Sequence, residues 1–299
     1  MRYGLLHIFI FIGNLSVFSQ IIPDEPAKPL FPTQIPDSLN QYRYLIEDEI
    51  VEDDILQEYY GESTTPTGYG ETTVFFIDGS SKSLNYKTFD NLNIVEGDII
   101  VYDGNNPDFK FGNVETGKLW ENGIVPYSLS DNLTSKLKGN IINAINHWED
   151  QTNIRFIPVN EHEDYIVFTL GASANVGSSS VGKVGGLQYI YLGSSTNTAV
   201  AIHEIGHAVG LWHEQSRSDR DKNVEILWEN IDKEDHDNFE KVGSIKNIYD
   251  FKSRMHYGKR TFSNNGRITI RPVDKSKKIK NDGYLSDGDI NTIKDLYGW

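Results

Sequence analysis

The sequence of 299 residues predicts an α+β fold. Short apolar runs typical of β-strands come first along the chain, and a helix that carries chemically active side chains follows them. Hydrophobic residues make up 38% and charged residues 24% of the chain, enough apolar material for a buried core. The predicted strands are residues 74–77, 99–102, 123–129, 154–158, 165–170 and 187–192, and the predicted helices are residues 132–150, a helix from Ala199 onward and a terminal helix after Ser286.

The N-terminal segment, residues 1–19, is predicted to be a secretory signal peptide. Its apolar stretch, residues 5–18, follows Arg2 and ends at the small residue Ser19. A membrane anchor is the alternative, but a helix that spans a bilayer needs roughly 20 apolar residues and this stretch is shorter. We therefore expect a secreted protein, extracellular or periplasmic, without integral membrane association.

Two segments of unusual composition follow the signal. Half of the ten prolines lie within residues 23–36, a composition that favours an extended backbone and predicts a linker. Residues 45–62 contain many acidic side chains and no Lys or Arg, and their apolar spacing predicts an acidic amphipathic helix. A calcium site is the alternative there, but the segment lacks a D-x-[DN]-x-[DN]-G loop.

Charge and cysteine content exclude several classes of function. The formal net charge is −15, so the chain repels phosphate backbones and nucleic acid is not expected as a partner. The chain contains no cysteine, which excludes disulfides, thiolate metal sites and cysteine nucleophiles. Any metal ion must therefore be held by histidine and carboxylate side chains.

The residues that indicate chemistry lie in the segment 203–214, with the sequence HEIGHAVGLWHE. Residues four apart share one face of a helix, so His203 and His207 point toward a common centre. Gly210 can adopt the left-handed conformation that ends a helix, which lets His213 approach from outside the helical repeat. Three imidazoles with an open fourth position predict a catalytic zinc site, with one Zn²⁺ per subunit.

Glu204 stands beside the first histidine and is predicted to be the general base. Zinc lowers the pKa of a bound water from about 15.7 toward about 7, so an ordinary carboxylate can accept its proton. The H-E-x-x-H pattern alone could be two histidines on an ordinary helix. The additional Gly210 and His213 favour the zinc site over that alternative.

At this point the sequence resembles the metzincins, in which an H-E-x-x-H-x-x-G-x-x-H helix is followed by a Met-turn. The segment SRMHYG at 253–258 is similar to that turn, and HEQSRSDRD at 213–221 is similar to the astacin family specifically. The resemblance extends from residue 119 to residue 299. It implies a metzincin zinc-protease fold: an N-terminal twisted mixed sheet with two long helices and a C-terminal subdomain.

The resemblance implies a role for each residue that matches the motif. His203, His207 and His213 would be zinc ligands, Glu204 the catalytic base and Met255 the floor under the metal. Tyr257 would be an additional zinc ligand in the resting enzyme that swings away to stabilise the oxyanion, although a packed aromatic with a satisfied hydroxyl is the alternative. His256 is expected to support the site, because the three-histidine set is already complete.

The resemblance also implies that the chain is made as a zymogen. VEGDI at 95–99 resembles the F-x-G-D segment of astacin pro-regions, in which the aspartate, here Asp98, occupies the open zinc position. A plain turn at residues 96–98 is the alternative. Alignment to the family predicts a pro-region at 20–110 and a catalytic domain at 111–299. An activating protease is expected to cut the chain between them, after Lys110.

Three further expectations follow from the resemblance. The N-terminus that cleavage after Lys110 creates would lie near Glu214. Lys259 and Arg260 would favour an acidic residue after the scissile bond of protein or peptide substrates. The absence of cysteine, where typical animal members carry two disulfides, points to a bacterial branch.

Two alternatives concern activity and a short acidic motif. A secreted binding protein that keeps the zinc domain as a recognition surface is the alternative function, but Glu204 and Tyr257 are both present. The residues 286–289 could be an acidic metal site, but their spacing favours a capping box for the terminal helix. Asn132 begins a glycosylation sequon and is predicted to begin the helix at 132–150.

Overall fold

The computed structural model describes residues 65–76, 79–89, 91–105, 118–242 and 247–299. All of them belong to one unit of the chain, residues 35–299. The predicted signal peptide, the Pro-rich linker, the acidic helix and the bond after Lys110 lie outside the described residues.

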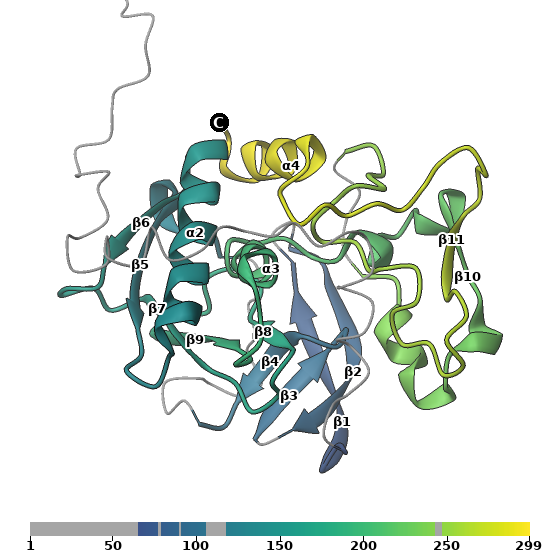
Figure 1. Ribbon diagram of the computed structural model, residues 1–299, viewed down its shortest axis with the longest axis horizontal. Helices are drawn as coiled ribbons and strands as arrows, with labels where there is room; N and C mark the ends of the chain where they lie inside the picture. The colour runs from purple at the N-terminus through teal and green to yellow at the C-terminus, as the bar shows by residue number, and fades with distance from the viewer. Residues whose placement is uncertain (1–64, 77–78, 90, 106–117, 243–246) are drawn as a thin grey trace, which may run out of the picture. The chain divides into compact units, whose positions relative to one another are not determined.

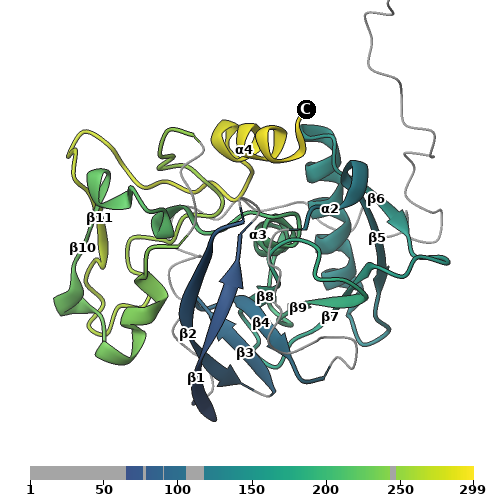
Figure 2. The same cartoon turned by 180° about the vertical axis from the view of Figure 1, so that it is seen from behind.

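A mixed sheet of nine strands organises the described chain, in the order β1-β2-β3-β4-β8-β9-β7-β5-β6 (Figures 1 and 2). The strands are β1 (Gly68–Phe75), β2 (Ser81–Phe89), β3 (Leu92–Val95), β4 (Ile99–Asp103), β5 (Ile124–Leu129), β6 (Arg155–Pro158), β7 (Tyr165–Leu170), β8 (Gly177–Ser179) and β9 (Leu187–Leu192). The strands predicted at 165–170 and 187–192 are confirmed residue for residue, and those predicted at 99–102, 123–129 and 154–158 are confirmed with one end shifted by one residue. The prediction at 74–77 is only partly right, because β1 begins six residues earlier and ends at Phe75, and residue 77 lies outside the described residues.

The sheet consists of two parts that differ in strand direction. β1 to β4 form an antiparallel meander, whereas β6, β5, β7 and β9 are parallel. The parts meet where β4 pairs in parallel with β8, at Ile99 and Ser179, and β8 is antiparallel to β9. Strands that precede the predicted catalytic domain therefore continue its sheet.

Two helices, α2 (Ser135–Gln151) and α3 (Thr198–Ala208), pack on each other and on the sheet (Figure 1). The predicted apolar face of α2 is buried, and the indole N–H of Trp148 donates to the carbonyl of Ile202 at 3.1 Å. The predicted start at Asn132 is wrong. Thr134 caps the helix, because its hydroxyl accepts from the amide of Leu137 at 3.2 Å, while the Asn132 amide donates to Thr169.

The C-terminal part contains less regular structure. It holds the small sheet of β10 (Val224–Ile226) and β11 (Ile270–Pro272), the helix α4 (Asp287–Tyr297) and a separate hydrophobic cluster. Ser286 and Asp289 form a reciprocal capping box at the start of α4, which confirms that prediction. Short 3-10 helices are η2 (Glu121–Gly123), η3 (Glu214–Ser216), η4 (Arg220–Lys222), η5 (Trp228–Asn230) and η6 (Lys233–Phe239).

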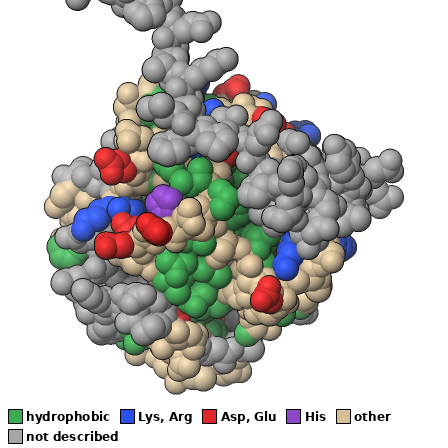
Figure 3. All heavy atoms as spheres, turned by 90° about the vertical axis from the view of Figure 1, so that its left-hand side faces the viewer, with side chains coloured by type: hydrophobic (Ala, Val, Ile, Leu, Met, Phe, Trp, Pro, Cys, Tyr) green, Lys and Arg blue, Asp and Glu red, His purple; other side chains and the backbone are tan. Residues whose placement is uncertain are grey.

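The surface carries both apolar and charged areas. Figure 3 shows hydrophobic side chains gathered in the middle of one face, with acidic and basic side chains near its margins. Among the described residues, no helix has the length and apolarity that crossing a bilayer requires.

Candidate metal centre

Helix α3 and the turn after it position the three histidines. Asn197 caps the helix start by accepting from the amide of Val200 at 3.1 Å. His203 and His207 lie one turn apart on α3. Gly210 has a φ of 114°, a value that side chains with a Cβ rarely adopt, and its amide donates to the carbonyl of His207. The chain therefore leaves the helix there, and His213 returns to the same centre.

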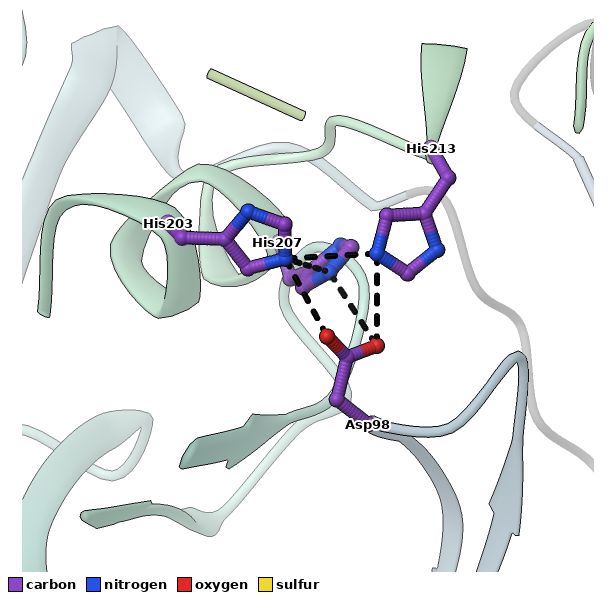
Figure 4. A group of neighbouring side chains, drawn as sticks. All are labelled: Asp98, His203, His207 and His213. Atoms are coloured by element: carbon purple, nitrogen blue, oxygen red, sulfur yellow. Dashed lines mark hydrogen bonds and ion pairs between the residues drawn. The ribbon is translucent and has the colours of Figure 1, made fainter. Parts of the chain in front are cut away.

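The ring nitrogens of the three histidines converge on one point (Figure 4). The Nε2 atom of His203 lies 3.1 Å from that of His207 and 3.2 Å from that of His213. Asp98 closes the group from the opposite side, with its carboxylate 3.1 Å from His203, 3.6 Å from His207 and 3.4 Å from His213. All four side chains are buried.

The hydrogen-bond partners of the Nδ1 atoms determine which nitrogen of each imidazole carries the proton. His203 Nδ1 lies 2.9 Å from the carbonyl of Arg254, and His207 Nδ1 lies 2.8 Å from the carbonyl of Leu211. A carbonyl only accepts hydrogen bonds, so both Nδ1 atoms donate and both Nε2 atoms present lone pairs inward. His213 Nδ1 faces the Glu96 carboxylate at 2.8 Å in the same way.

This arrangement fits a cation. Two unprotonated nitrogens 3.1 Å apart repel each other unless a positive charge lies between them. Donor atoms at zinc–nitrogen distances of about 2.0–2.1 Å in a tetrahedron lie about 3.4 Å apart, close to the separations observed here. Three neutral imidazoles and one carboxylate are also the donor types that zinc prefers. The residues therefore fit one zinc ion with Asp98 as the fourth ligand.

The pKa shifts of the cluster arise from burial and from the charges and hydrogen bonds within the cluster. Burial raises the pKa of Asp98, but the charge on His213 and the hydrogen bonds from the histidines outweigh it and hold that pKa well below its usual value. Burial lowers the pKa of His203 to about 3. Burial also opposes the charged form of His213, but Asp98 and then Glu96 raise its pKa to about 9.

Glu204 lies beside this cluster. Its Oε2 atom is buried and has no hydrogen-bond partner within the described part of the chain. Burial, and secondarily the charge of Asp98, raises the pKa of Glu204 well above its usual value, while Arg254 lowers it. Gly177 on β8 lies against the Glu204 carboxyl, so closely that a Cβ at Gly177 would overlap it. The glycine therefore makes room for the carboxyl group.

The Met-turn contacts helix α3 and the His213 ring. A Cβ placed on Gly206 of α3 would lie only 2.6 Å from Met255 Sδ, so the thioether packs directly against that helix. The Tyr257 ring packs on the His213 ring with centroids 4.7 Å apart. Its hydroxyl does not point into solvent but donates to the backbone carbonyl of Glu96. The hydroxyl that the resemblance assigns to catalysis is therefore occupied by the upstream segment.

Glu214 and His256 support the surrounding loops. Glu214 accepts from Arg217 at 2.9 Å and from the amide of Asp250 at 2.7 Å, and burial raises its pKa to about 7. His256 is buried between the Tyr249 hydroxyl, 2.8 Å from Nε2, and the Tyr257 carbonyl, 2.7 Å from Nδ1. Neither ring nitrogen of His256 is directed at the cluster.

Lys259 and Arg260, which are predicted to favour an acidic residue after the scissile bond, directly follow the Met-turn. Lys259 is half-buried and Arg260 is exposed, and the Lys259 carbonyl accepts from the amide of Thr269 at 2.7 Å. Phe262, two residues farther on, lies against the upstream segment: a Cβ at Gly97 would be 2.8 Å from its ring.

Three contributors to the site were not predicted from the sequence. They are Glu96, which contacts His213, Gly177, which lies against Glu204, and Gln215, whose side chain accepts from the Tyr257 amide at 3.0 Å. Glu96 carried a detectable signal, because it stands two residues before Asp98 in the segment that had been singled out. Gln215 lies in the astacin-like segment 213–221, but nothing in the sequence indicates its contact with Tyr257, and Gly177 carried no signal, since only the folded chain brings it to the site.

Comparison with known proteins agrees with this geometry. The family model of astacin, a peptidase family, matches residues 112–298. The chain is 36% identical over 185 residues to zinc metalloproteinase nas-13 of Caenorhabditis elegans, covering 60% of this chain and 40% of that protein. It is 37% identical over 194 residues to human Tolloid-like protein 1, covering 61% of this chain and 19% of that protein. The chain thus spans less than half the length of these curated relatives.

A solved structure supports the fold. The hatching enzyme zinc-protease High choriolytic enzyme 1 of the medaka Oryzias latipes superposes with a TM-score of 0.56 at 32% identity, covering 60% of this chain and 92% of that one. The predicted α+β zinc-protease fold is therefore confirmed. Because the family model matches more than half of its residues, this chain belongs to the astacin family of peptidases.

Proposed function

We propose that this protein is a secreted zinc-dependent endopeptidase that is made as an inactive zymogen. The observation that carries the proposal is the convergence of three histidine Nε2 atoms on a single point, with Glu204 Oε2 beside them, an atom without a hydrogen-bond partner among the described residues. This arrangement lies within the segment that matches the astacin family. Proteins or peptides are the proposed substrates, and internal peptide bonds the proposed target.

Each residue would have one task in the reaction. His203, His207 and His213 would hold the zinc ion, and the chemistry that zinc supplies when bound is Lewis-acid activation of a water and of the scissile carbonyl. Glu204 would accept the proton of the attacking water on Oε2 and deliver it to the leaving amine. Tyr257 would donate a hydrogen bond from its hydroxyl to the oxyanion that develops on the carbonyl, once that hydroxyl has left Glu96.

Latency would depend on the upstream segment. Asp98 would occupy the fourth ligand position and thereby exclude the attacking water. The contact between the Tyr257 hydroxyl and the Glu96 carbonyl would at the same time withhold the oxyanion donor. One turn, residues 96–98, would thus block both the nucleophile and the electrostatic stabilisation.

Activation would follow cleavage by another protease near Lys110, which gives a mature chain from residue 111. The new ammonium group would then pair with Glu214, a buried carboxylate next to the third histidine. N-terminal sequencing of the active form would test this assignment, and a start outside residues 105–118 would contradict it.

Hydrolysis of an internally quenched peptide tests the function, with the chain cut near Lys110 and then separated from its N-terminal fragment by washing in mild denaturant. We expect turnover that o-phenanthroline abolishes and one zinc per chain by mass spectrometry. Glu204→Gln should lower kcat by about 10²–10⁴-fold and keep the zinc, because the carboxylate moves protons and does not bind the metal. Glu149→Gln on α2 is the matched control, since that carboxylate accepts from the Phe156 amide of β6 and takes no part in the histidine cluster. A zinc-loaded, fully processed chain that cuts no peptide would overturn the proposal.

A further inference from the structure

The strands β1 to β4, residues 68–103, contact the family-matched part of the chain far beyond the turn that blocks the zinc position. We call this segment the inhibitory meander. It joins the sheet of the catalytic part through β4, where the amide of Ser179 donates to the Asp98 carbonyl at 3.0 Å. Its remaining contacts with the catalytic part are distributed over its full length.

The meander shares a hydrophobic core with the catalytic part. Five of the buried residues in this cluster come from the meander and two come from the catalytic part: Val74, Leu84, Val95, Ile99 and Val101 pack with Val181 and Val242. Phe76 also packs on Trp212, with ring centroids 5.4 Å apart. The apolar face of the meander is therefore covered by the catalytic part, and separation of the two would return these side chains to water.

Polar contacts fasten the meander at both ends of this core. Lys87 pairs with Asp235 at 2.6 Å and Lys82 pairs with Glu240 at 3.1 Å, which connects β2 to the C-terminal part. At the end of β4, the Tyr191 hydroxyl donates to Asp103 at 2.8 Å. Surface ion pairs contribute little energy each, even where one is partly buried as Lys87–Asp235 is, but together with the hydrogen bond to Asp103 they fix one docked orientation.

None of these contacts depends on the peptide bond that processing would cut. All the meander residues involved lie at or before position 103, whereas the proposed cleavage lies near residue 110. Cleavage removes only the covalent tether, so release becomes a dissociation step with its own rate.

We infer that the inhibitory meander stays bound to the catalytic domain after cleavage and acts as a noncovalent inhibitor, so that its departure is the activating step. The inference rests on the proposed function for its activity readout, but its binding readout is independent of it. A slow departure would allow a cut, latent complex to be stored, and a protease that digests the meander would complete activation.

The experiment uses the full chain with an affinity tag at the C-terminus and a recognition site for a sequence-specific protease in place of residues 106–110, so that cutting leaves residue 111 as the new N-terminus. After complete cutting, we expect both fragments to co-elute in size-exclusion chromatography and peptidase activity to stay below about a tenth of its final value. Washing the immobilised protein with mild denaturant should release the meander and the activity together. Fragments that separate as fast as they are cut would overturn the inference.

Paired variants test whether the shared core retains the meander. Val74→Ala removes a fully buried side chain of the meander and should raise the release rate at least about tenfold. Thr73→Ala, the exposed neighbour on the same strand, should leave that rate unchanged. Equal release from both variants would contradict a role for the core. If the washed protein bound zinc and cut no peptide, the proposed function would fail, while co-elution would still decide the inference.

Discussion

The carboxylate of Glu96 accepts a hydrogen bond from Nδ1 of His213 at 2.8 Å, across 117 positions of sequence. The other two histidines rest on backbone carbonyls of the catalytic part, at Arg254 and Leu211. Partners of this kind fix the orientation and the tautomer of a metal-binding imidazole. The orientation of the third histidine therefore depends on Glu96, a residue that the proposed activation would remove.

Replacing Glu96 should weaken latency without altering the mature enzyme. In Glu96→Ala the buried Nδ1–H of His213 loses its acceptor, and an unsatisfied buried donor costs about 1–3 kcal/mol. We expect peptidase activity of the uncut chain to rise by about 5-fold to 150-fold, in proportion to that cost. Glu96→Gln keeps an acceptor oxygen and should stay closer to the parent. After removal of the pro-region all three proteins should have the same kcat/KM, and equal latency in all three would contradict the prediction.

Tyr257→Phe should act on turnover in the processed enzyme. The variant keeps the ring that packs on His213 and removes only the hydroxyl, which is the proposed oxyanion donor. Loss of one such donor typically lowers kcat by about 10²–10³-fold. We expect KM and zinc content to change little, and both are measurable on the same samples. Tyr249→Phe is the control, because that hydroxyl contacts His256 and not the reacting atoms; a kcat loss of equal size there would argue for a structural effect.

Much of the fold could be predicted because its signals are local. The strands at 165–170 and 187–192 are short apolar runs bounded by turn residues. Ser286 is a helix cap that can be recognised in the sequence, and it predicts the start of the terminal helix. The convergence of His203 and His207 follows from helical spacing alone, and the φ of Gly210 follows from its place at the helix end.

Long-range pairing accounts for what could not be predicted. Nothing in the apolar run at 99–102 indicates that it pairs in parallel with Ser179, far along the chain. The contact of Gly177 with Glu204 also requires β8 to be in place before the two residues can meet. The start of α2 was misplaced for a different reason: Asn132 and Thr134 are both good caps, and the side-chain bond from Asn132 to Thr169 decides between them.

Charge removal after the Met-turn tests the proposed preference for acidic residues. Lys259 and Arg260 come directly after the Met-turn, and a carboxylate on the substrate would gain a charge-assisted bond there. In a peptide-library digest we expect Asp and Glu to be enriched after the scissile bond. Lys259→Ala combined with Arg260→Ala should reduce that enrichment by about 5-fold to 10-fold, and Lys136→Ala on α2 should not. A parent profile without acidic enrichment would contradict the assignment.

Gly97→Ala should loosen the latent state by a steric route. Gly97 has a φ of 83°, and a Cβ there would lie 2.8 Å from the Phe262 ring. The left-handed conformation alone costs an L-residue about 1–2 kcal/mol, and the contact with Phe262 adds to it. Because Gly97 lies in the turn that carries Asp98 and Phe262 packs against that turn, we expect the uncut variant to show higher peptidase activity and a lower melting temperature.

A second glycine separates backbone strain from the contact with Phe262. Gly79 has a φ of 79°, and a Cβ there would meet no atom within 4 Å. Gly79→Ala therefore carries the same conformational cost without the collision, and it should lower the melting temperature slightly while leaving the chain latent. Shortening the opposing ring, in Gly97→Ala with Phe262→Leu, should restore part of the latency. If Gly79→Ala released as much activity as Gly97→Ala, strain in the meander and not the fit of the turn would govern latency.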